Sequence, residues 1–406
     1  MLRPRGLLTP PAMAMAPLLV AAALVASFSG AGAAPRPPPA GPKPQQGRVI
    51  EYGGNYLGGY IPQQDAPKDL LQSGVWGVAA GHYHSMAIYG KSRKVVEWPP
   101  ANASFGYYNP DPSTQRLQPE NLVNVVAVSA GQHHSLALTK TGKVVFWTRQ
   151  LLGNASDDLP PLLGPKAKAK VKAIAAGRGG YSMALLNNGS IIEWGPARNY
   201  SDNATWYRPP PPGLVISFPE GDVNGAINGN VSVPAPRLRA QAIAAGWDHS
   251  LALLENGTVV AWGGRRGQYQ AFLSWRAMNV SADAKQDVVA IAAGNQHSLA
   301  LLANGTVVAW GTVLANAAGA TCAAEGCVTY PPPAGPNNVP AEALKDVTAI
   351  SAGSLFGMAL LKGGRVVVWG KSTGYLYINF VPDDAQSGVF AIAGGSAHYL
   401  AVKATG

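Results

Sequence analysis

One unit recurs along most of the chain, and its clearest copy is AIAAGNQHSLALLANGTVVAWG, residues 290–311. Gly294 and a short polar segment separate two apolar runs, and Asn304-Gly305 separates the second run from a third that ends in Trp310 and Gly311. Asn-Gly between two such runs is typical of a type I′ hairpin, in which both turn residues have positive φ. Each copy is therefore predicted to form a small antiparallel sheet.

One copy of the unit is divided between the two ends of the chain, and this division predicts a closed ring. The glycine of the unit returns seven times, at Gly81, Gly131, Gly177, Gly246, Gly294, Gly353 and Gly395, but the tryptophan follows only six of them, at Trp98, Trp147, Trp194, Trp262, Trp310 and Trp369. The last copy stops at its hairpin turn, and residues 47–53, GRVIEYG, match the missing third run. One repeat split in this manner implies that its two parts meet.

A closed ring of small antiparallel sheets is a β-propeller. We predict an all-β, seven-bladed β-propeller over residues 47–406, closed by an N-terminal strand that completes the last blade. The composition agrees, because 13% charged residues, 48 glycines and 34 prolines favour turn-rich β structure over helices.

The first 46 residues are expected to lie outside the propeller. Residues 1–34 have a basic start, a 12-residue apolar run and a small-residue segment, Ala31-Gly32-Ala33, which is typical of a secretory signal peptide. An uncleaved anchor or an organelle transit peptide is the alternative. Residues 35–46 are predicted to be a Pro-rich linker. We therefore expect a secreted, extracellular protein with no transmembrane segment in the mature chain.

Two further features are consistent with secretion. Asn-x-Ser/Thr sequons suggest glycosylation at Asn102, Asn154, Asn199, Asn203, Asn230, Asn279, Asn188, Asn256 and Asn304. The last three of these begin Asn-Gly turns, so hairpin chemistry alone explains them equally well. Cys322 and Cys327, the only two cysteines, are expected to form a local disulfide.

The repeated polar residues favour packing over catalysis. Five histidines occupy the third position after the repeated glycine, and Tyr181 and Phe356 replace them in the other two copies. A residue that Tyr or Phe can replace is expected to serve as a packing and hydrogen-bonding element. Glu51, Glu97 and Glu193 are expected on the solvent side of their strands. We find no motif for a catalytic site, a metal or a cofactor, and predict that the chain is not an enzyme.

The residues that vary between copies are the candidate binding residues. They lie just after each repeated glycine, in turns that should gather on one face of the disc. We predict a partner-binding face made of Tyr83, His133, Arg178, Trp247, Asp248, Gln296 and Leu355. The alternative for Trp247 is that it packs against a neighbouring loop.

The pattern Ala-Gly-x-x-His-Ser-Leu-Ala-Leu…Asn-Gly-x-Val-Val-Ala-Trp-Gly resembles the repeat of the regulator of chromosome condensation family over roughly residues 47–406. This resemblance implies a seven-bladed propeller. The linkers, such as Val381-Pro-Asp-Asp-Ala-Gln-Ser-Gly-Val389, are similar to those of a secreted bacterial β-lactamase-inhibitor propeller, which implies a protein-binding face. The family's usual continuation after Trp-Gly is approached only at residues 54–58 and 264–268.

Three functions remain open from the sequence. The first is a secreted, glycosylated module that binds a protein, as an interaction, inhibitory or extracellular-matrix module. The second is a carbohydrate-binding or cell-wall-associated module, suggested by the net charge of +10 and by Lys166, Lys168, Lys170 and Lys172, which alternate along one strand face. A solvated edge strand explains these lysines as well. The third is an intracellular exchange factor for a small GTPase. We expect no nucleic-acid partner.

Overall fold

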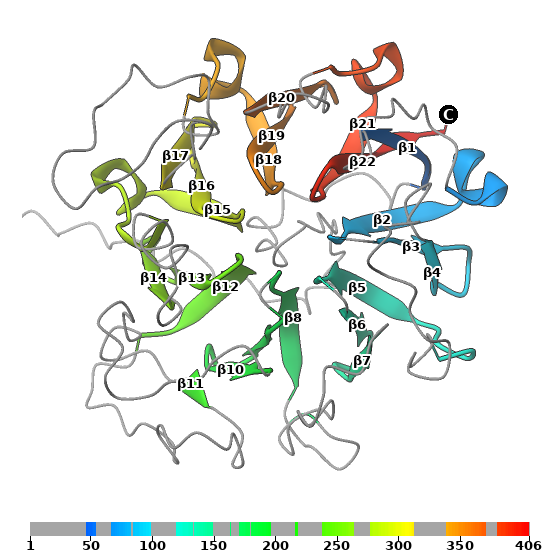
Figure 1. Ribbon diagram of the computed structural model, residues 1–406, viewed down its shortest axis with the longest axis horizontal. Helices are drawn as coiled ribbons and strands as arrows, with labels where there is room; N and C mark the ends of the chain where they lie inside the picture. The colour runs from blue at the N-terminus through cyan, green and yellow to red at the C-terminus, as the bar shows by residue number, and fades with distance from the viewer. Residues whose placement is uncertain are drawn as a thin grey trace, which may run out of the picture.

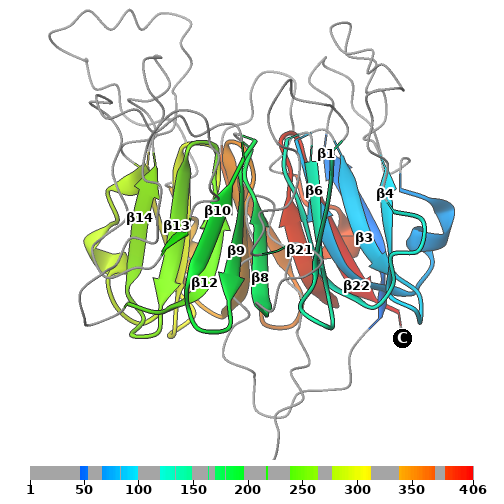
Figure 2. The same ribbon diagram turned by 90° about the horizontal axis from the view of Figure 1, so that it is seen from below.

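The fold is a disc of seven antiparallel blades arranged around an axis, seen in a computed structural model (Figure 1). The structure describes residues 46–53, 66–82, 84–98, 119–132, 134–148, 163, 170–178, 180–195, 216–217, 238–263, 277–311, 338–370 and 380–405. Seen from the side, the strands run between the two faces of the disc (Figure 2). The predicted all-β, seven-bladed propeller is confirmed.

The first strand of each blade lies nearest the axis. In order, blades 1 to 7 begin with β2 (Val75–Ala80), β5 (Val125–Ala130), β8 (Val171–Ala176), β12 (Ala240–Ala245), β15 (Val288–Ala293), β18 (Val347–Ala352) and β21 (Val389–Gly394). Each of these strands contacts the first strand of the next blade, and the contacts return from β21 to β2. The first strands are rich in buried alanine, such as Ala79 and Ala292. Small side chains fit here because the strands converge.

The second and third strands complete each sheet outward from the axis. The second strands are β3 (Ser85–Tyr89), β6 (His134–Thr139), β9 (Ser182–Leu186), β13 (His249–Leu254), β16 (His297–Leu302), β19 (Phe356–Leu361) and β22 (His398–Ala404). The third strands are β4 (Lys94–Trp98), β7 (Val144–Thr148), β10 (Ile191–Trp194), β14 (Val259–Gly263), β17 (Val307–Gly311), β20 (Val366–Gly370) and, for blade 7, β1 (Gly47–Gly53).

β1 lies along the C-terminal strand β22. The two strands pair antiparallel from Gly47 opposite Ala404 to Gly53 opposite His398. Residues 47–53 thus supply the third strand of the sheet that begins with β21. A single further pair, Gly47 with Val75, joins this sheet to blade 1, so that the six strands form one sheet in the order β21-β22-β1-β2-β3-β4.

The hairpins between second and third strands differ from the predicted turn type. In blade 5, Gly305 N–H donates to Leu302 O at 2.9 Å and Leu302 N–H donates to Thr306 O at 2.9 Å, which makes a three-residue turn. Gly305 has a φ of 85°, whereas Asn304 is not among the described residues with positive φ. The turn is therefore a type I turn followed by a left-handed glycine, not the two-residue type I′ turn that Asn-Gly suggested.

The hydrophobic core is divided into seven clusters, one between each pair of neighbouring blades. Between blades 1 and 2, for example, Met86 and Val95 pack against Val128 and Trp147. The cluster between blades 7 and 1 contains Val49 of β1 together with Val78 and Leu400. Because every blade has a core on both sides, no blade buries its apolar surface without both neighbours.

Short linker elements cover the outside of the disc. Four 3-10 turns, η1 (Lys68–Leu71), η3 (Ala282–Ala284), η4 (Ala341–Leu344) and η5 (Asp383–Ala385), each precede the first strand of a blade. In blade 3, the two-residue strand β11 (Ile216–Ser217) pairs in parallel with the outer strand β10. The described residues contain no helix long and apolar enough to cross a membrane.

Candidate functional site

The loops between the first and second strands come together near the axis of the disc, and we call them the axial loops. In each of them the repeated glycine closes a tight turn. The N–H of Gly294, for instance, donates to His297 O at 2.9 Å. A Cβ on Gly294 would meet the His297 ring and would lie 2.7 Å from Gly353 O of the next blade. Glycine recurs here because the aromatic side chain three positions on folds over it.

That aromatic side chain links each blade to the next. His84, His134, His249 and His398 are buried, and the Nε2 of each lies 2.9–3.0 Å from a serine Oγ of the following blade, at Ser135, Ser182, Ser298 and Ser85 respectively. The pair His398–Ser85 joins blade 7 to blade 1. The prediction that these histidines pack and hydrogen-bond is confirmed, and the structure adds that their partners lie on the next blade.

The exceptions fall where the sequence of the unit changes. Tyr181 replaces the histidine in blade 3, and its hydroxyl donates to His249 O at 2.5 Å. In blade 6, Gly357 occupies the position of the serine, and His297 Nε2 has no hydrogen-bond partner among the described residues. Phe356 replaces the histidine of blade 6. In blade 7, Tyr399 occupies the position of the serine, and its hydroxyl donates to Phe380 O at 2.8 Å.

Of the glutamates before the third-strand aromatic, Glu51 and Glu193 are buried and Glu97 is half-buried, which corrects the prediction that they face solvent. Trp98 Nε1 donates to Glu51 Oε2 at 3.1 Å, and Trp147 Nε1 donates to Glu97 Oε2 at 2.6 Å. Glu193 accepts from both Trp262 and Ser250, at 3.0 and 3.2 Å. A buried indole N–H needs an acceptor, and the carboxylate of the preceding blade supplies it.

Arg178 was predicted to lie on the partner-binding face. In the structure it is instead fully buried among the axial loops. Its Nη1 donates to Asn295 Oδ1 of blade 5 at 2.6 Å and also to Ser354 Oγ of blade 6. Ser354 Oγ is in turn 3.1 Å from Ser396 Oγ of blade 7. One side chain of blade 3 therefore connects three other blades. In the sequence, this network could have been inferred from the small polar residues that follow the repeated glycine of blades 5, 6 and 7, which are Asn295, Ser354 and Ser396.

Burial and charge act on the ionisable groups around Arg178. Burial lowers the pKa of Arg178 itself. Burial first, and the Arg178 charge second, lower the pKa of His297 to about 3 and that of His398 to about 4. Both histidines are therefore neutral near pH 7. The guanidinium is the cation at the centre of this network.

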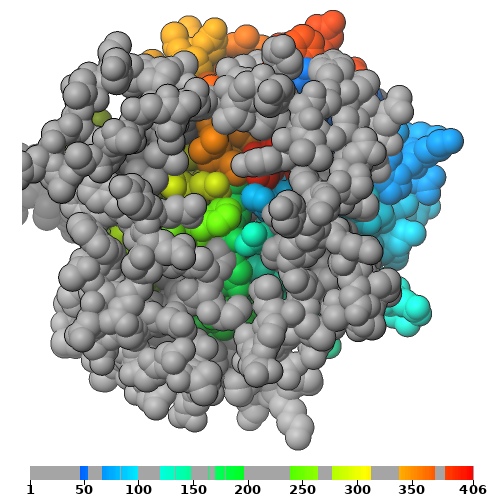
Figure 3. All heavy atoms as spheres, in the orientation of Figure 1, coloured from blue at the N-terminus to red at the C-terminus, as the bar shows by residue number. Residues whose placement is uncertain are grey.

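The remaining predicted face residues surround the Arg178 network. Trp247 of blade 4 lies edge-on to His82 of blade 1, with ring centroids 6.0 Å apart. Trp247, Gln296 and Leu355 are half-buried, and Asp248 is buried. Trp247 Nε1 and Gln296 Oε1 have no hydrogen-bond partner among the described residues. In the space-filling view, atoms of several blades meet near the centre of this face (Figure 3). Tyr83 and His133 lie outside the described residues.

The sequons that the structure describes are exposed, and three of them are hairpin turns. The Oδ1 atoms of Asn188, Asn256 and Asn304 accept the backbone N–H two residues on, at 3.0–3.1 Å. Their turn role is thereby explained, and Asn279 is also exposed. Asn102, Asn154, Asn199, Asn203, Asn230, Cys322, Cys327 and residues 1–45 lie outside the described residues.

The structure describes two of the four alternating lysines. Lys170 and Lys172 are exposed at the start of β8, whereas Lys166 and Lys168 fall outside the described ranges. Within those ranges, no three His, Cys, Asp or Glu side chains are grouped so that they could hold a metal ion.

One known repeat family matches the sequence of two blades. The regulator of chromosome condensation (RCC1) repeat matches residues 240–268 and 288–312, which are blades 4 and 5. The fold is similar to that of Prp20p from Saccharomyces cerevisiae, a protein studied for its binding to Gsp1p and histones. The TM-score is 0.58 and the identity 17%, over 89% of this chain and 92% of Prp20p.

Two curated relatives resemble part of the chain. The mitochondrial RCC1 domain-containing protein RUG3 of Arabidopsis thaliana is 29% identical over 212 residues, which are 47% of this chain and 42% of RUG3. The guanine nucleotide exchange factor SRM1 of Saccharomyces cerevisiae is 27% identical over 161 residues, 36% of this chain and 31% of SRM1. The chain thus spans less than half the length of either relative.

These relatives overturn the prediction of an extracellular protein. A mitochondrial protein and a guanine nucleotide exchange factor point to the interior of the cell, not to secretion. The apolar run of residues 17–28 fulfils only a compositional pattern, which an organelle transit peptide or another N-terminal segment can share. The chain is therefore a seven-bladed β-propeller, and two of its blades match the regulator of chromosome condensation repeat.

Proposed function

We propose that this propeller binds a protein partner through its axial loops, at His82, Trp247, Gln296 and Leu355. The observation that carries the proposal is that these half-buried side chains come from four different blades and differ in chemistry, while the frame around them repeats. Repeated frame residues account for folding. The varied residues at one end of the axis are free to determine a partner.

Two polar atoms in this group support the proposal. Trp247 Nε1 is a buried donor and Gln296 Oε1 a buried acceptor, and neither has a partner among the described residues. A buried polar atom without a hydrogen bond costs about 1–3 kcal/mol. A partner that displaces the side chains covering these two atoms and supplies an acceptor and a donor would recover that cost. Indole side chains are also frequent anchors of protein interfaces.

The test is co-purification of the full chain with proteins from its own cells. The variant Trp247→Ala/Gln296→Ala/Leu355→Ala should lose a stoichiometric partner that the native chain retains. A matched variant, Glu255→Ala/Lys285→Ala/Lys362→Ala, changes exposed residues on the outer turns and should retain it. Equal retention by both variants would remove the axial loops from the interface.

A second candidate is nucleotide exchange on a small GTPase, which the similarity to SRM1 favours. Release of labelled GDP from Gsp1p, with and without the purified chain, measures it directly. Acceleration that is lost in the Trp247→Ala variant would make the GTPase the partner of the axial loops. Unchanged release would leave protein binding without exchange. That the chain is not itself an enzyme stays a prediction.

A further inference from the structure

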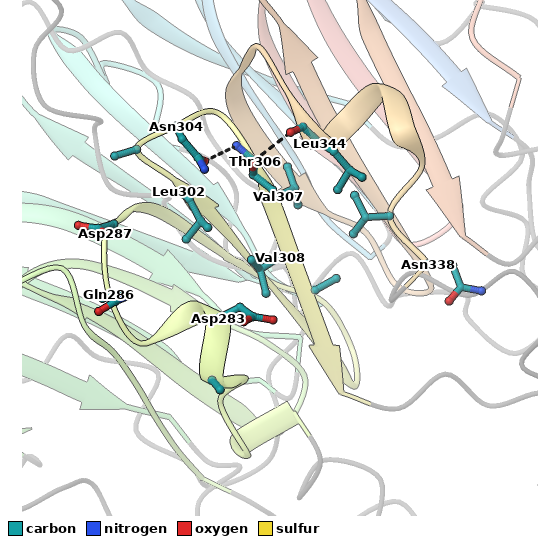
Figure 4. Close-up of a pocket in the computed structure, with 14 residues that line it drawn as sticks. Asp283, Gln286, Asp287, Leu302, Asn304, Thr306, Val307, Val308, Asn338 and Leu344 are labelled. Carbon is teal, nitrogen blue, oxygen red and sulfur yellow. Dashed lines mark hydrogen bonds between the residues drawn. The ribbon is translucent and has the colours of Figure 1, made fainter.

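A groove of about 950 Å³ follows the outer strand of blade 5 (Figure 4). Its floor is the third strand β17 and the hairpin turn before it. One wall is the turn that leads into blade 5, and the other is the turn that leads into blade 6. The residues that define these three sides are Val307, Val308 and Ala309, then Asp283, Gln286 and Asp287, and last Asn338, Val339 and Leu344.

The floor of the groove presents a strand edge that no strand in the described part of the chain pairs with. Leu302 and Thr306 form a hydrogen-bonded pair of the β16–β17 ladder, because Leu302 N–H donates to Thr306 O. Hydrogen-bonded and non-bonded pairs alternate along an antiparallel ladder. The N–H and C=O of Val307 and Ala309 therefore point away from β16. No strand among the described residues pairs with this edge of β17. Val307 is buried, so Ala309, which is half-buried, is the accessible point.

Blade 3 shows what such an edge can accept. Its third strand β10 pairs in parallel with β11, through Ile191 opposite Ile216 and Ile192 opposite Ser217. Counted from the Asn-Gly turn, Ile191 and Ile192 correspond to Val307 and Val308 in blade 5. The groove thus lies at the position where blade 3 already carries an added strand.

The walls of the groove are fixed before any ligand binds. Thr306 Oγ1 donates to Leu344 O at 3.0 Å, which ties the wall from blade 6 to the hairpin turn. Ala303 N–H donates to Asp287 O at 2.8 Å, which ties the opposite wall to the same turn. Little ordering of the protein is then needed when a strand binds, and preorganisation of this kind favours affinity.

The charge of the groove selects the ligand. Asp283 and Asp287 are exposed and line it, and among the described lining residues there is no Lys, Arg or His. Lys285 and Lys345 lie nearby on the same turns, but they are matched by Glu342 and Asp346. Leu344, with 46% of its surface exposed, adds an apolar contact. The groove is complementary to an extended segment that carries both basic and apolar side chains.

From this edge, its walls and its charge, we infer that the groove is a second protein-binding site, which takes an extended, basic segment of a partner as an added strand on β17. It is separate from the axial loops and does not depend on them. The linker that follows β17, residues 312–337, contains no Lys, Arg or His, so it lacks the charge that the groove complements. Main-chain hydrogen bonds would give the affinity, and Asp283 and Asp287 the preference for cations.

The experiment measures binding of a short, fluorescently labelled peptide of alternating lysine and valine to the full chain by anisotropy. A peptide of alternating glutamate and valine is the control for charge. The variant Asp283→Asn/Asp287→Asn should weaken binding of the basic peptide up to about tenfold, since two exposed ion pairs are lost. Ala309→Pro should abolish binding, because proline removes the outward N–H of the edge.

The outcomes are distinguishable. Binding of the basic peptide that both variants weaken supports the site. Equal binding of the acidic peptide, or unchanged binding in the Asp283→Asn/Asp287→Asn variant, overturns it, whether or not Ala309→Pro folds. Concentration-dependent self-association of the native chain that Asp283→Asn/Asp287→Asn leaves intact and Ala309→Pro removes would assign the edge to a second copy, which also overturns the inference.

Discussion

At the scale of single residues, the acceptor of the third-strand indole N–H differs from blade to blade. Glu193 accepts the indole N–H of Trp262, the backbone carbonyl of Ala277 accepts that of Trp310, and Trp194 Nε1 has no partner among the described residues. The difference follows from the residue before the third-strand tryptophan of the preceding blade, which is glutamate, alanine or phenylalanine. Among the described residues, a carboxylate and a backbone carbonyl are thus alternative acceptors for this indole N–H.

This arrangement predicts the cost of removing a buried glutamate. Glu193→Ala leaves both Trp262 Nε1 and Ser250 Oγ without the carboxylate, and should lower the free energy of unfolding by about 2–3 kcal/mol. Glu255→Ala, in an exposed hairpin turn, should change it by less than about 0.5 kcal/mol. Urea denaturation of the two variants and the native chain makes the comparison. Equal stability of all three would show that Glu193 has no such role.

The buried histidines predict how stability depends on pH. The pKa values of His297 and His398 are about 3 and about 4 in the fold, below the value of 6.5 that a free histidine has. As the pH falls below about 6.5, the unfolded chain binds protons that the folded chain does not, so stability is lost progressively down to about pH 4 for His398 and about pH 3 for His297. Each histidine contributes up to about 1.4 kcal/mol per pH unit in this window.

His398→Gln tests that assignment, because it removes one of these two histidines. The slope of unfolding free energy against pH should decrease between pH 6.5 and pH 4 relative to the native chain. A slope that does not change would mean that other groups cause the acid sensitivity.

At the scale of elements, β1 is the strand whose partners are most distant in sequence. Ile50 is buried with Met358 and Ile392, whereas Arg48 binds Asp384 at 2.7 Å in a pair that is partly exposed. We expect Ile50→Ala to lower the free energy of unfolding by about 2–4 kcal/mol through the cavity that it leaves. Asp384→Asn should cost less than about 1 kcal/mol, since exposed ion pairs contribute little.

Denaturation with two spectroscopic probes would separate these effects. A comparable loss of unfolding free energy in both variants would show that the ion pair contributes as much as apolar contact to holding β1 on β22.

Prediction from the sequence succeeded for the elements and failed for the side chains that join them. Repeat spacing and the split seventh copy were sufficient to place the blades, because both are properties of the chain itself. The side-chain orientations of Glu193 and Arg178 depend on hydrogen bonds to Trp262 and Ser354. These residues belong to other blades and become neighbours only after folding. Secretion was inferred from the signal-like pattern of residues 1–34, the sequons and the cysteine pair, and relatives of the repeat contradict it.

At the scale of the whole molecule, the ring should tolerate a change in where the chain begins. Gly47 lies opposite Ala404, so joining Thr405 directly to Gly47 gives a turn of the same length as Ala303-Asn304-Gly305-Thr306. A permuted chain with this join, opened between Lys362 and Gly363 in another hairpin, should fold and melt close to the native temperature.

The same join opened inside the first strand β18, between Ile350 and Ser351, is the control and should not fold, because it interrupts a buried strand beside the axis. Thermal unfolding followed by circular dichroism distinguishes the two. A hairpin-opened chain that fails to fold would contradict the equivalence of the blades.

The pairing of β1 with β22 also has a consequence in time. Gly47 is among the first residues of the disc to be synthesised, and its partner Ala404 is among the last. Six blades can form their own three strands as the chain emerges, but the edge of β1 waits until nearly all of the propeller has left the ribosome. Contacts this distant in sequence form slowly, and an unpaired strand edge is prone to aggregate in the meantime. The period before closure is when this protein most needs a chaperone.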